Sequence, residues 1–352
     1  MDISLCMIMK NEEKNLAKCL DAVKDCGFEL VLVDTGSTDE TVSIAKRYTD
    51  TVHHFDWIGD FAAARNYSLS LASNDWVLVL DCDEIITKID PDALCRIMKL
   101  PEQCIGMISR RNHYDNNGVA SVYTDGVERF FNRKVFHYEG IIHEQVRPMR
   151  LYAIPDCGIY HDTGIVCEHS GYEGTFEERL AKKKRNEELL LKQLEKDPGD
   201  PYIWFQLGQC HNGFDDEKAA YYYGKGLECD VDPELEYVQM MIIAYGYALT
   251  HLNRFEEALS IANVYDEFAT SADFVVMMGI VYLRTGRLME ALKEFLKATT
   301  MEVSHVEGAN SFIPFYNMGC ISELLDDRDN AISFFRKCGD YPPALEKLKE
   351  LS

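Results

Sequence analysis

Two aspartates, Asp81 and Asp83, directly follow a short apolar run at residues 76–80. The run is typical of a buried strand in a parallel sheet, where both faces are covered. Open α/β sheets bind ligands beyond the carboxyl ends of their strands, and two carboxylates at this spacing can share one hard divalent cation. Aspartate is also common in turns at strand ends. The pair by itself therefore predicts either a metal site or a turn.

The chain before this pair alternates between strand and helix patterns. Apolar runs at residues 3–9, 28–33 and 52–55 predict strands, and apolar residues at helical spacing lie between them. This alternation predicts an α/β fold with a parallel, doubly wound sheet and right-handed crossovers. Further along the chain, the polar run at residues 110–118 predicts a loop. Polar clusters at the ends of these strands then share one sheet edge with the aspartate pair: Lys10 to Glu12 and Asp34 to Asp39.

Two side chains near this edge, those of Asp34 and Arg65, suit either a nucleotide ligand or a structural role. Asp34 can accept hydrogen bonds from a base or a ribose, but an aspartate there also suits a turn or a helix cap. Gly36 permits a tight turn after the strand. Arg65, on a helix expected near residues 61–71, can offset diphosphate charge with its forked donors. An arginine at a helix surface more commonly forms an ion pair.

Four motifs in this order resemble family 2 glycosyltransferases, and their combination is far more specific than any one of them. The motifs lie at residues 6–12, 33–39, 60–66 and 80–84. The resemblance implies a GT-A fold and an inverting transfer from a nucleotide sugar, usually with UDP as the carrier. The sequence contains no P-loop and no dinucleotide-binding glycine motif, so a kinase or a dinucleotide enzyme has no support.

The resemblance also assigns roles to individual residues. It implies that Asp34 contacts the uracil, that Asp81 lies near the ribose or the metal, and that Asp83 holds Mg²⁺ or Mn²⁺ on the diphosphate. His161, after an apolar stretch, resembles a histidine that closes the donor site and is the predicted metal ligand beside Asp81 and Asp83. His169 repeats the same pattern and stays open as an alternative to His161. The donor-binding candidates are Lys10, Asn11, Glu12, Asp34, Gly36, Arg65, Asn66 and Asp81.

An inverting transfer needs a carboxylate that takes a proton from the acceptor. The resemblance places this base after the aspartate pair, and Glu144 in the sequence Ile-His-Glu-Gln is the first candidate. His143 beside it can contact the acceptor or a metal. The two residues can equally be a strand-end pair with structural hydrogen bonds. The motif departs from the Glu-Asp pair that is usual in the family, which leaves the base assignment open.

The composition of the chain limits the cellular compartment and the kinds of binding partner that we expect. The formal net charge of −23 over 352 residues disfavours binding to nucleic acid or to anionic membranes. No stretch approaches the ~20 apolar residues of a membrane span, and no signal peptide is recognisable at the start. The 12 cysteines include no C-x-x-C pair, so reduced, mostly packed thiols are expected. These features predict a cytoplasmic protein.

The second half is predicted to be helical. A long amphipathic helix over residues 176–196 precedes the breaker at 197–201. Four glycines are each followed twelve residues later by an alanine, a pattern that resembles tetratricopeptide repeats and predicts a solenoid with a concave binding surface. The pairs are Gly208/Ala220, Gly246/Ala258, Gly279/Ala291 and Gly319/Ala331. The predicted organisation is a GT-A domain at 1–172, a linker helix at 173–199 and the repeats at 200–352.

The resemblance to family 2 glycosyltransferases implies a metal-dependent transferase that takes a sugar from a UDP-sugar, and the repeats suggest a peptide or protein side chain as the acceptor. The architecture is similar to that of peptide glycosyltransferases, including S-glycosyltransferases of the sublancin type. Synthesis of a cell-surface polysaccharide or lipooligosaccharide is an alternative, as is a non-catalytic scaffold whose repeats bind a partner or form a homodimer. A nucleotidyltransferase is disfavoured, because it needs a glycine-rich basic loop that residues 10–12 do not provide.

Overall fold

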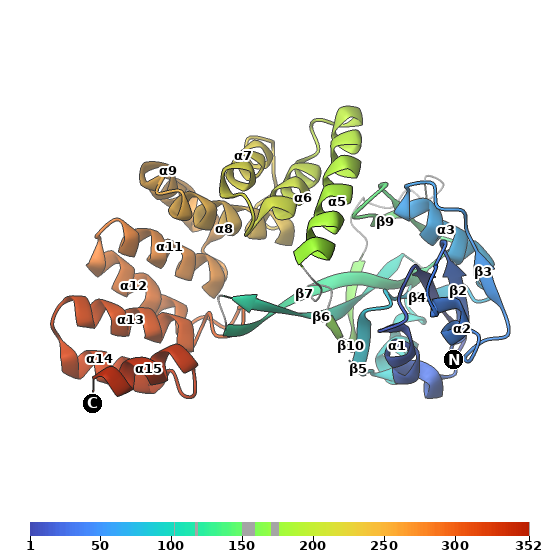
Figure 1. Cartoon of the computed structure of the whole chain (residues 1–352), viewed down its shortest axis with the longest axis horizontal. Coiled ribbons are helices and arrows are strands. Elements are labelled where there is room, and N and C mark those ends of the chain that lie inside the picture. Colours follow the sequence, from blue (N-terminus) through green and yellow to red (C-terminus); the bar gives the residue numbers. More distant parts are fainter. Residues whose placement is uncertain (102, 117–118, 150–158, 170–175, 352) are drawn as a thin grey trace. The chain divides into compact units, whose positions relative to one another are not determined.

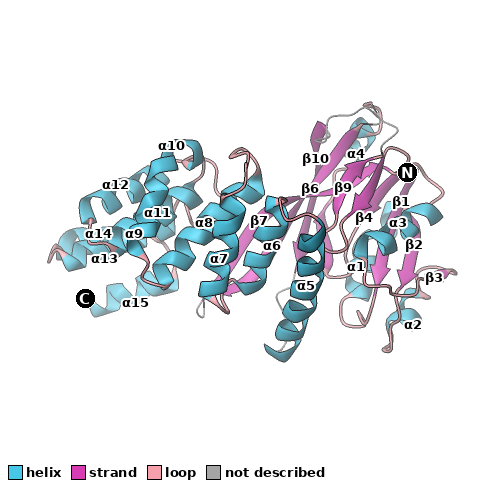
Figure 2. Cartoon of the chain, turned by 90° about the horizontal axis from the view of Figure 1, so that it is seen from above, coloured by secondary structure: helices cyan, strands magenta, loops and turns pink. Residues whose placement is uncertain are grey.

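The computed structural model describes residues 1–101, 103–116, 119–149, 159–169 and 176–351. The chain divides into two compact units, the first comprising Met1–Tyr114 and Val122–Arg179 and the second Asp115–Ser121 and Leu180–Ser352. The first contains a β-sheet with helices, and the second is built from paired helices (Figures 1 and 2). The α/β class and the following helical repeats are therefore confirmed.

The first half of the first unit forms the parallel part of an eight-stranded sheet, with neighbours in the order β3-β2-β1-β4. Alternate residues of β1 enter different core clusters, because successive strand side chains point to opposite faces. The parallel pairing brings the carboxyl ends of these strands to one edge, as predicted. The elements are β1 (Ile3–Met9), α1 (Leu16–Val23), η1 (Lys24–Cys26), β2 (Glu29–Asp34), α2 (Thr41–Ala45), β3 (Val52–His54), α3 (Phe61–Leu71) and β4 (Trp76–Val79).

The remainder of the sheet is mixed, so the prediction of a parallel, doubly wound sheet is wrong beyond β4. The sheet continues β4-β7-β6-β10-β5, with β4 antiparallel to β7 and β10 antiparallel to β5. A smaller sheet pairs β8 with β9. The elements are β5 (Glu84–Lys88), α4 (Pro91–Ile97), β6 (Cys104–Asn116), β7 (Val119–Asn132), β8 (Phe136–Glu139), β9 (Gln145–Pro148) and β10 (Ile159–His169).

The prediction of a loop at residues 110–118 is also wrong for residues 110–116. Residues 110–116 belong to strand β6. Two charged side chains of this strand pair with charged residues on the neighbouring strands: Arg110 contacts Asp125 of β7, and Arg111 contacts Glu168 of β10. A strand can therefore be highly polar when its neighbours supply compensating charges, which a single-sequence reading does not reveal.

The second unit stacks helices in pairs: α6 with α7, α11 with α12, and α13 with α14. The long helix α5, predicted as a linker, joins this unit from Leu180 onward. Residues 170–175, where the first domain was predicted to end, lie outside the described residues. The helices are α5 (Phe176–Lys196), α6 (Pro201–His211), α7 (Asp216–Leu227), α8 (Glu236–His251), α9 (Phe255–Ser260), η2 (Ile261–Val264), α10 (Tyr265–Phe268), α11 (Ala272–Arg284), α12 (Leu288–Ala298), α13 (Phe312–Leu324), α14 (Arg328–Lys337) and α15 (Pro342–Glu350).

The repeat glycines mark places where an aromatic ring presses against a neighbouring helix backbone. A Cβ added to Gly208 would lie 2.3 Å from Cε1 of Tyr223, a fully buried residue of the partner helix. Gly279 and Gly319 face aromatic rings of their own partner helices in the same way. Gly246 differs, because it packs against Met277 of the following pair. Paired helices thus approach each other closely at Gly208, Gly279 and Gly319. At Gly246 the close contact is with the following helix pair instead.

No helix in the part of the chain that the structure describes has both the length and the apolar character needed to cross a membrane. The described cysteines are free thiols, and five of those in the first unit are buried among apolar side chains: Cys6, Cys19, Cys82, Cys104 and Cys167.

Candidate functional site

The aspartate pair lies just beyond the carboxyl end of β4, where the backbone turns into β5. Strand β4 is parallel to β1, and the amide of Leu80 still donates to the carbonyl of Cys6 at 3.3 Å. The amide of Asp81 donates to Glu84 Oε2 at 3.0 Å, which closes the turn. Asp83 follows with a side chain that is 22% exposed. The sequence prediction that this pair sits at a strand end facing a shared sheet edge is therefore confirmed.

The ends of β1 and β2 are joined by a set of side-chain-to-backbone hydrogen bonds centred on Asn11 and Asp34. The Asn11 side chain accepts a hydrogen bond from the Thr38 amide at 2.8 Å, and the Asn11 amide donates to the Ser37 hydroxyl at 3.0 Å. Asn11 itself adopts a left-handed conformation with φ of 57°. An asparagine tolerates that conformation better than most residues, and its side chain stabilises both loops here.

Asp34 is 7% exposed and holds the turn after β2. Its carboxylate accepts hydrogen bonds from the amides of Gly36 at 3.1 Å and Ser37 at 3.0 Å, while His54 Nδ1 lies 3.6 Å away. Gly36 has a φ of 101°, a region that favours glycine. Asp34 thus stabilises the turn after β2, which is the structural role considered for it from the sequence. It lies at the sheet edge where the resemblance places a contact with the uracil.

Lys10 and Glu12 flank Asn11 on the same loop. Lys10 is exposed, and the amide of Glu12 donates to the Thr41 hydroxyl at 2.6 Å. Three candidates that are separated by 23 or more residues in sequence, Asn11, Asp34 and Asp81, therefore lie at the ends of three adjacent strands, β1, β2 and β4.

Arg65 connects the aspartate pair to the candidate base. It is 5% exposed on α3, and its Nη2 lies 2.7 Å from Asp81 Oδ1 while its Nε donates to Glu144 Oε1. Burial alone would lower the pKa of Arg65, but the carboxylates of Asp81 and Glu144 raise it well above its usual range. Arg65 is therefore a buried, permanently charged link between two predicted site residues, instead of the surface ion pair that was its alternative.

Asp81 is clamped between two arginines. Arg129 Nη2 lies 2.7 Å from Asp81 Oδ2, so each oxygen of this carboxylate accepts a charged hydrogen bond. Burial by itself would raise the pKa of Asp81, but the charges of Arg65 and Arg129 outweigh it and hold the pKa well below its usual range. Because both carboxylate oxygens of Asp81 bind arginines, Asp83 is the carboxylate of the pair that is not held by an arginine contact of this kind.

Sequence reasoning did not identify Arg129 and Glu84 as site residues. Arg129 Nη2 also contacts Glu84 Oε1 at 2.8 Å, and Glu84 is completely buried. Arg110 contacts Glu84 at 3.5 Å and forms a forked pair with Asp125 at 2.6 and 3.1 Å. The available signal was the spacing on strand β7, where Asp125 and Arg129 are four residues apart and therefore lie on the same face of the sheet.

Of the two candidate histidines, the structure brings His169 to the aspartate pair. His169 Nε2 lies 3.4 Å from Asp83 Oδ2, and His169 pairs with Glu84 in the sheet register. His161 is eight residues earlier on β10 and pairs with Gly106. At about 3.3 Å per residue it lies roughly 25 Å away along the strand. The structure therefore does not place His161 with the other predicted metal-binding residues.

The donor atoms of Asp83 and His169 suit a divalent cation. Carboxylate oxygen and imidazole nitrogen are both ligands of Mn²⁺, and Mg²⁺ takes few protein ligands when substrate phosphates complete its shell. Within the described residues no group of three or more histidine, cysteine, aspartate or glutamate side chains is arranged to hold a metal ion. A cation at this edge would therefore depend on a phosphate-bearing ligand for the remaining positions.

The candidate base lies on the loop between β8 and β9. His143 has a φ of 49° and Gly140 a φ of 102°, so this short loop contains two left-handed residues. A non-glycine residue in that region costs of order 1 kcal/mol and is often found at functional sites. The Phe61 amide donates to the Ile141 carbonyl at 2.9 Å, which fixes the loop to the start of α3.

Asn66, a predicted donor-binding residue, instead fastens α3 to β8. Its amide nitrogen donates to the Tyr138 carbonyl at 2.8 Å, and its oxygen accepts from the Tyr138 amide at 2.8 Å. Both polar ends of the side chain are thus used within the protein. Asn66 positions the strand that leads to Glu144, whose side chain is 9% exposed.

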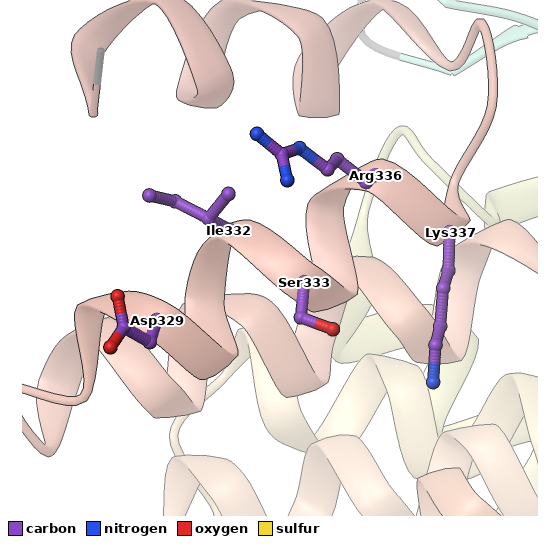
Figure 3. A pocket seen from close by; sticks show the side chains of 5 residues that line it. All are labelled: Asp329, Ile332, Ser333, Arg336 and Lys337. Atoms are coloured by element: carbon purple, nitrogen blue, oxygen red, sulfur yellow. The ribbon is translucent and has the colours of Figure 1, made fainter.

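A separate hollow of about 470 Å³ lies beside α14 in the second unit. Figure 3 shows that the side chains around it point in different directions along one helix and do not converge on a point: Asp329, Ile332, Ser333, Arg336 and Lys337. The hollow contains none of the predicted site residues, and its exposed charges have the pattern of a solvated helix face.

Comparisons with known proteins match the sheet-containing part and the helical part of the chain separately. The family model "Glycosyl transferase family 2" matches residues 4–152, and a tetratricopeptide repeat model matches residues 314–344. A TPR repeat-containing protein of Synechococcus elongatus is 32% identical over 62% of this chain and 54% of its own length. The SPbeta prophage-derived glycosyltransferase SunS of Bacillus subtilis is 28% identical over 63% of this chain and 52% of its own. The chain thus spans about half the length of these curated relatives.

Among solved structures, the chain is similar to the crystal structure of MamA, with 18% identity and a TM-score of 0.38 over 51% of this chain and 97% of that one. The sheet edge at β2, β1 and β4, with its ordered polar loops, lies within the segment matched by the family model. The family 2 glycosyltransferase model thus matches the sheet-containing part of the chain, residues 4–152, and the tetratricopeptide repeat model matches residues 314–344 of the helical part.

Proposed function

We propose that the chain is an inverting glycosyltransferase that moves a sugar from a UDP-sugar to a peptide or protein side chain. The observation that carries this proposal is the meeting of Asn11, Asp34 and the Asp81–Asp83 turn at the carboxyl ends of three adjacent strands. Ligands bind at such edges of open α/β sheets. The family match over residues 4–152 supports glycosyl transfer as the reaction.

In the proposed reaction, the acceptor atom bonds to the anomeric carbon as the bond from that carbon to the UDP oxygen breaks. Glu144 takes the proton that the acceptor loses, and UDP departs with the bonding electrons. Asp83 and His169 would hold the Mg²⁺ or Mn²⁺, with His169 preferred to His161 because it lies beside Asp83. The bound cation would offset the charge that develops on the leaving diphosphate.

The buried arginines keep this arrangement in place. Arg65 bonds to both Glu144 and Asp81, so the candidate base and the aspartate turn are held by one rigid side chain. Arg129 secures the other Asp81 oxygen and Glu84. A transferase needs its reacting groups held in a fixed geometry before substrate binds, and paired buried charges provide such rigidity.

Titration calorimetry of UDP with and without Mn²⁺ tests the donor and metal assignments. Mn²⁺ is expected to strengthen UDP binding to the unaltered chain, and Asp83→Ala is expected to remove that dependence. Asp75→Ala is the matched control, because Asp75 lies at the opposite end of β4 in an exposed pair with Lys134. UDP binding that does not respond to the metal in the unaltered chain would contradict the proposed cation site.

The sugar and the acceptor need a separate experiment. Mass spectrometry of a panel of UDP-sugars incubated with the chain identifies the donor by its slow hydrolysis. The same donor is then supplied with peptides that carry serine, threonine, cysteine or asparagine acceptors. A peptide product supports the proposed acceptor class, whereas transfer only to saccharide acceptors favours polysaccharide or lipooligosaccharide synthesis. Absence of UDP-sugar binding and of turnover would favour the scaffold alternative.

A further inference from the structure

We infer that Asn112 is a positioning residue for the candidate cation site: its side-chain amide binds Nδ1 of His169 and so orients the ring with Nε2 toward Asp83. Asn112 lies on β6, between β7 and β10 in the sheet, and is 5% exposed. The inference rests on the proposed function, because it concerns the histidine assigned there to the cation.

The orientation of the Asn112 amide follows from its partners on β7. Its nitrogen lies 3.0 Å from Asp125 Oδ1 and 3.2 Å from the carbonyl oxygen of Tyr123. A carboxylate and a carbonyl only accept hydrogen bonds, so the NH₂ group of Asn112 must face them. The amide oxygen of Asn112 therefore faces the other way, toward β10.

The amide oxygen then decides which nitrogen of His169 carries the proton. Asn112 Oδ1 lies 2.7 Å from His169 Nδ1, and an amide oxygen can only accept. Nδ1 of His169 must therefore carry the hydrogen. In a neutral imidazole the other nitrogen, Nε2, is then unprotonated, and this is the atom that lies 3.4 Å from Asp83 Oδ2. In that tautomer a cation between Nε2 and Asp83 Oδ2 would have a ligand atom on each side.

Asp125 in turn is anchored so that the amide cannot easily reverse. Arg110 donates to both oxygens of Asp125, at 3.1 and 2.6 Å. Arg110, Asp125, Asn112 and His169 therefore form a continuous series across the adjacent strands β7, β6 and β10. Partners that fix the tautomer and ring orientation of a metal-binding histidine typically contribute about 10- to 100-fold to metal affinity.

The tautomer can be read in the full-length chain without any turnover. Long-range proton–nitrogen NMR spectra of histidine-labelled protein, recorded without metal at about pH 8.5 where an ordinary imidazole is neutral, distinguish the two ring nitrogens. Substitution His169→Gln assigns the signal. The expected result is an Nδ1-protonated His169 that shifts toward the other tautomer in Asn112→Leu, a change of similar volume without hydrogen-bonding groups. An Nε2-protonated His169 in the unaltered chain would overturn the inference.

Metal affinity provides the second measurement, by Mn²⁺ electron paramagnetic resonance in the presence of UDP. Asn112→Leu is expected to weaken Mn²⁺ binding about 10- to 100-fold while leaving metal-free UDP binding and the unfolding transition of the first unit in place. His161→Ala, on the same strand but distant from Asp83, is the control and is expected to leave Mn²⁺ affinity unchanged.

A double-substitution cycle separates positioning from general loosening of the fold. If Asn112 acts through His169, Asn112→Leu has little further effect on Mn²⁺ affinity in a His169→Gln background. An equal effect in both backgrounds would overturn the inference and leave the proposed function standing. Failure of the unaltered chain to bind Mn²⁺ with UDP would overturn the cation site itself, and the positioning role with it.

Discussion

Replacing Asp81 by asparagine should destabilise the first unit strongly, because it leaves two buried arginines with too few acceptors. Each oxygen of Asp81 is 2.7 Å from a guanidinium nitrogen, and both arginines have side chains less than 10% exposed. An asparagine can accept from one arginine, but its NH₂ group then faces the other, which keeps only its second carboxylate partner, Glu144 for Arg65 or Glu84 for Arg129. Removing one member of a buried ion pair costs about 3 to 5 kcal/mol.

The Asp81 side chain is 33% exposed, so solvent screens part of its interaction and the lower value, about 3 kcal/mol, is expected. For an m-value of about 2 to 3 kcal/mol/M in urea, the unfolding midpoint should fall by about 1 to 1.5 M. Tryptophan fluorescence is the assay. Of the 3 tryptophans, Trp57 and Trp76 lie in the first unit, so a Trp204→Phe background makes the signal specific to it.

The control is Asp75→Asn at the other end of the same strand. Asp75 forms a 2.8 Å pair with Lys134, but the two side chains are 46% and 60% exposed. Exposed pairs contribute at most about 1 kcal/mol, so this change should move the midpoint far less. Equal shifts for the two substitutions would refute the claim that the Asp81 pairs are shielded from solvent.

The stability contributed by Asp81 should also depend on pH in a defined direction. The pKa of Asp81 in the folded chain lies well below that of an unfolded aspartate, about 3.9. The stabilisation is therefore fully present above about pH 4 and is lost as the pH falls below that value toward the folded pKa. The gap in unfolding free energy between the unaltered chain and Asp81→Asn should be constant near neutrality and shrink in acid.

Two further substitutions test the base and the repeat packing. Glu144→Gln keeps an acceptor for Arg65 and should retain UDP-sugar binding while transfer falls by about 10²- to 10⁴-fold, measured by product mass spectrometry; full activity would assign the base elsewhere. Gly208→Ala should cost about 1 to 3 kcal/mol by urea unfolding, because its Cβ would lie 2.3 Å from the Tyr223 ring. The helical control Gly224→Ala, whose Cβ would have no neighbour closer than 3.6 Å, should stabilise by up to about 1 kcal/mol; the opposite order would contradict the packing argument.

The location of the site could largely be predicted, because several of its residues come directly after a predicted strand. Asp34 and the Asp81–Asp83 pair each come directly after an apolar run, and parallel strands bring such ends together whatever the intervening loops do. The repeat glycines were recognisable for a similar reason. The requirement for a small residue recurs wherever an aromatic ring of the partner helix meets the backbone.

The sequence alone did not distinguish His169 from His161, because both end similar apolar stretches. Register distinguished them: the antiparallel pairing of β10 with β5 sets His169 opposite Glu84 and beside Asp83. A pairing register depends on contacts between strands that are distant in the chain, and the local pattern of either strand does not encode it. The reading of residues 110–116 as a loop failed for the same reason, since the neighbours that balance their charges come from other strands.

The sequence by itself determined the α/β class, the helical repeats and the strand-end positions of Asn11, Asp34 and Asp83, because each is a local pattern with a single geometric consequence. Only the tertiary structure decided that Asp81 serves two arginines, that Arg65 joins Asp81 to Glu144, and that Asn112 orients His169. Those assignments depend on which charges a buried environment forces together. Because an unpaired charge in the interior is so costly, the packing of distant strands determines the partner of each buried charge.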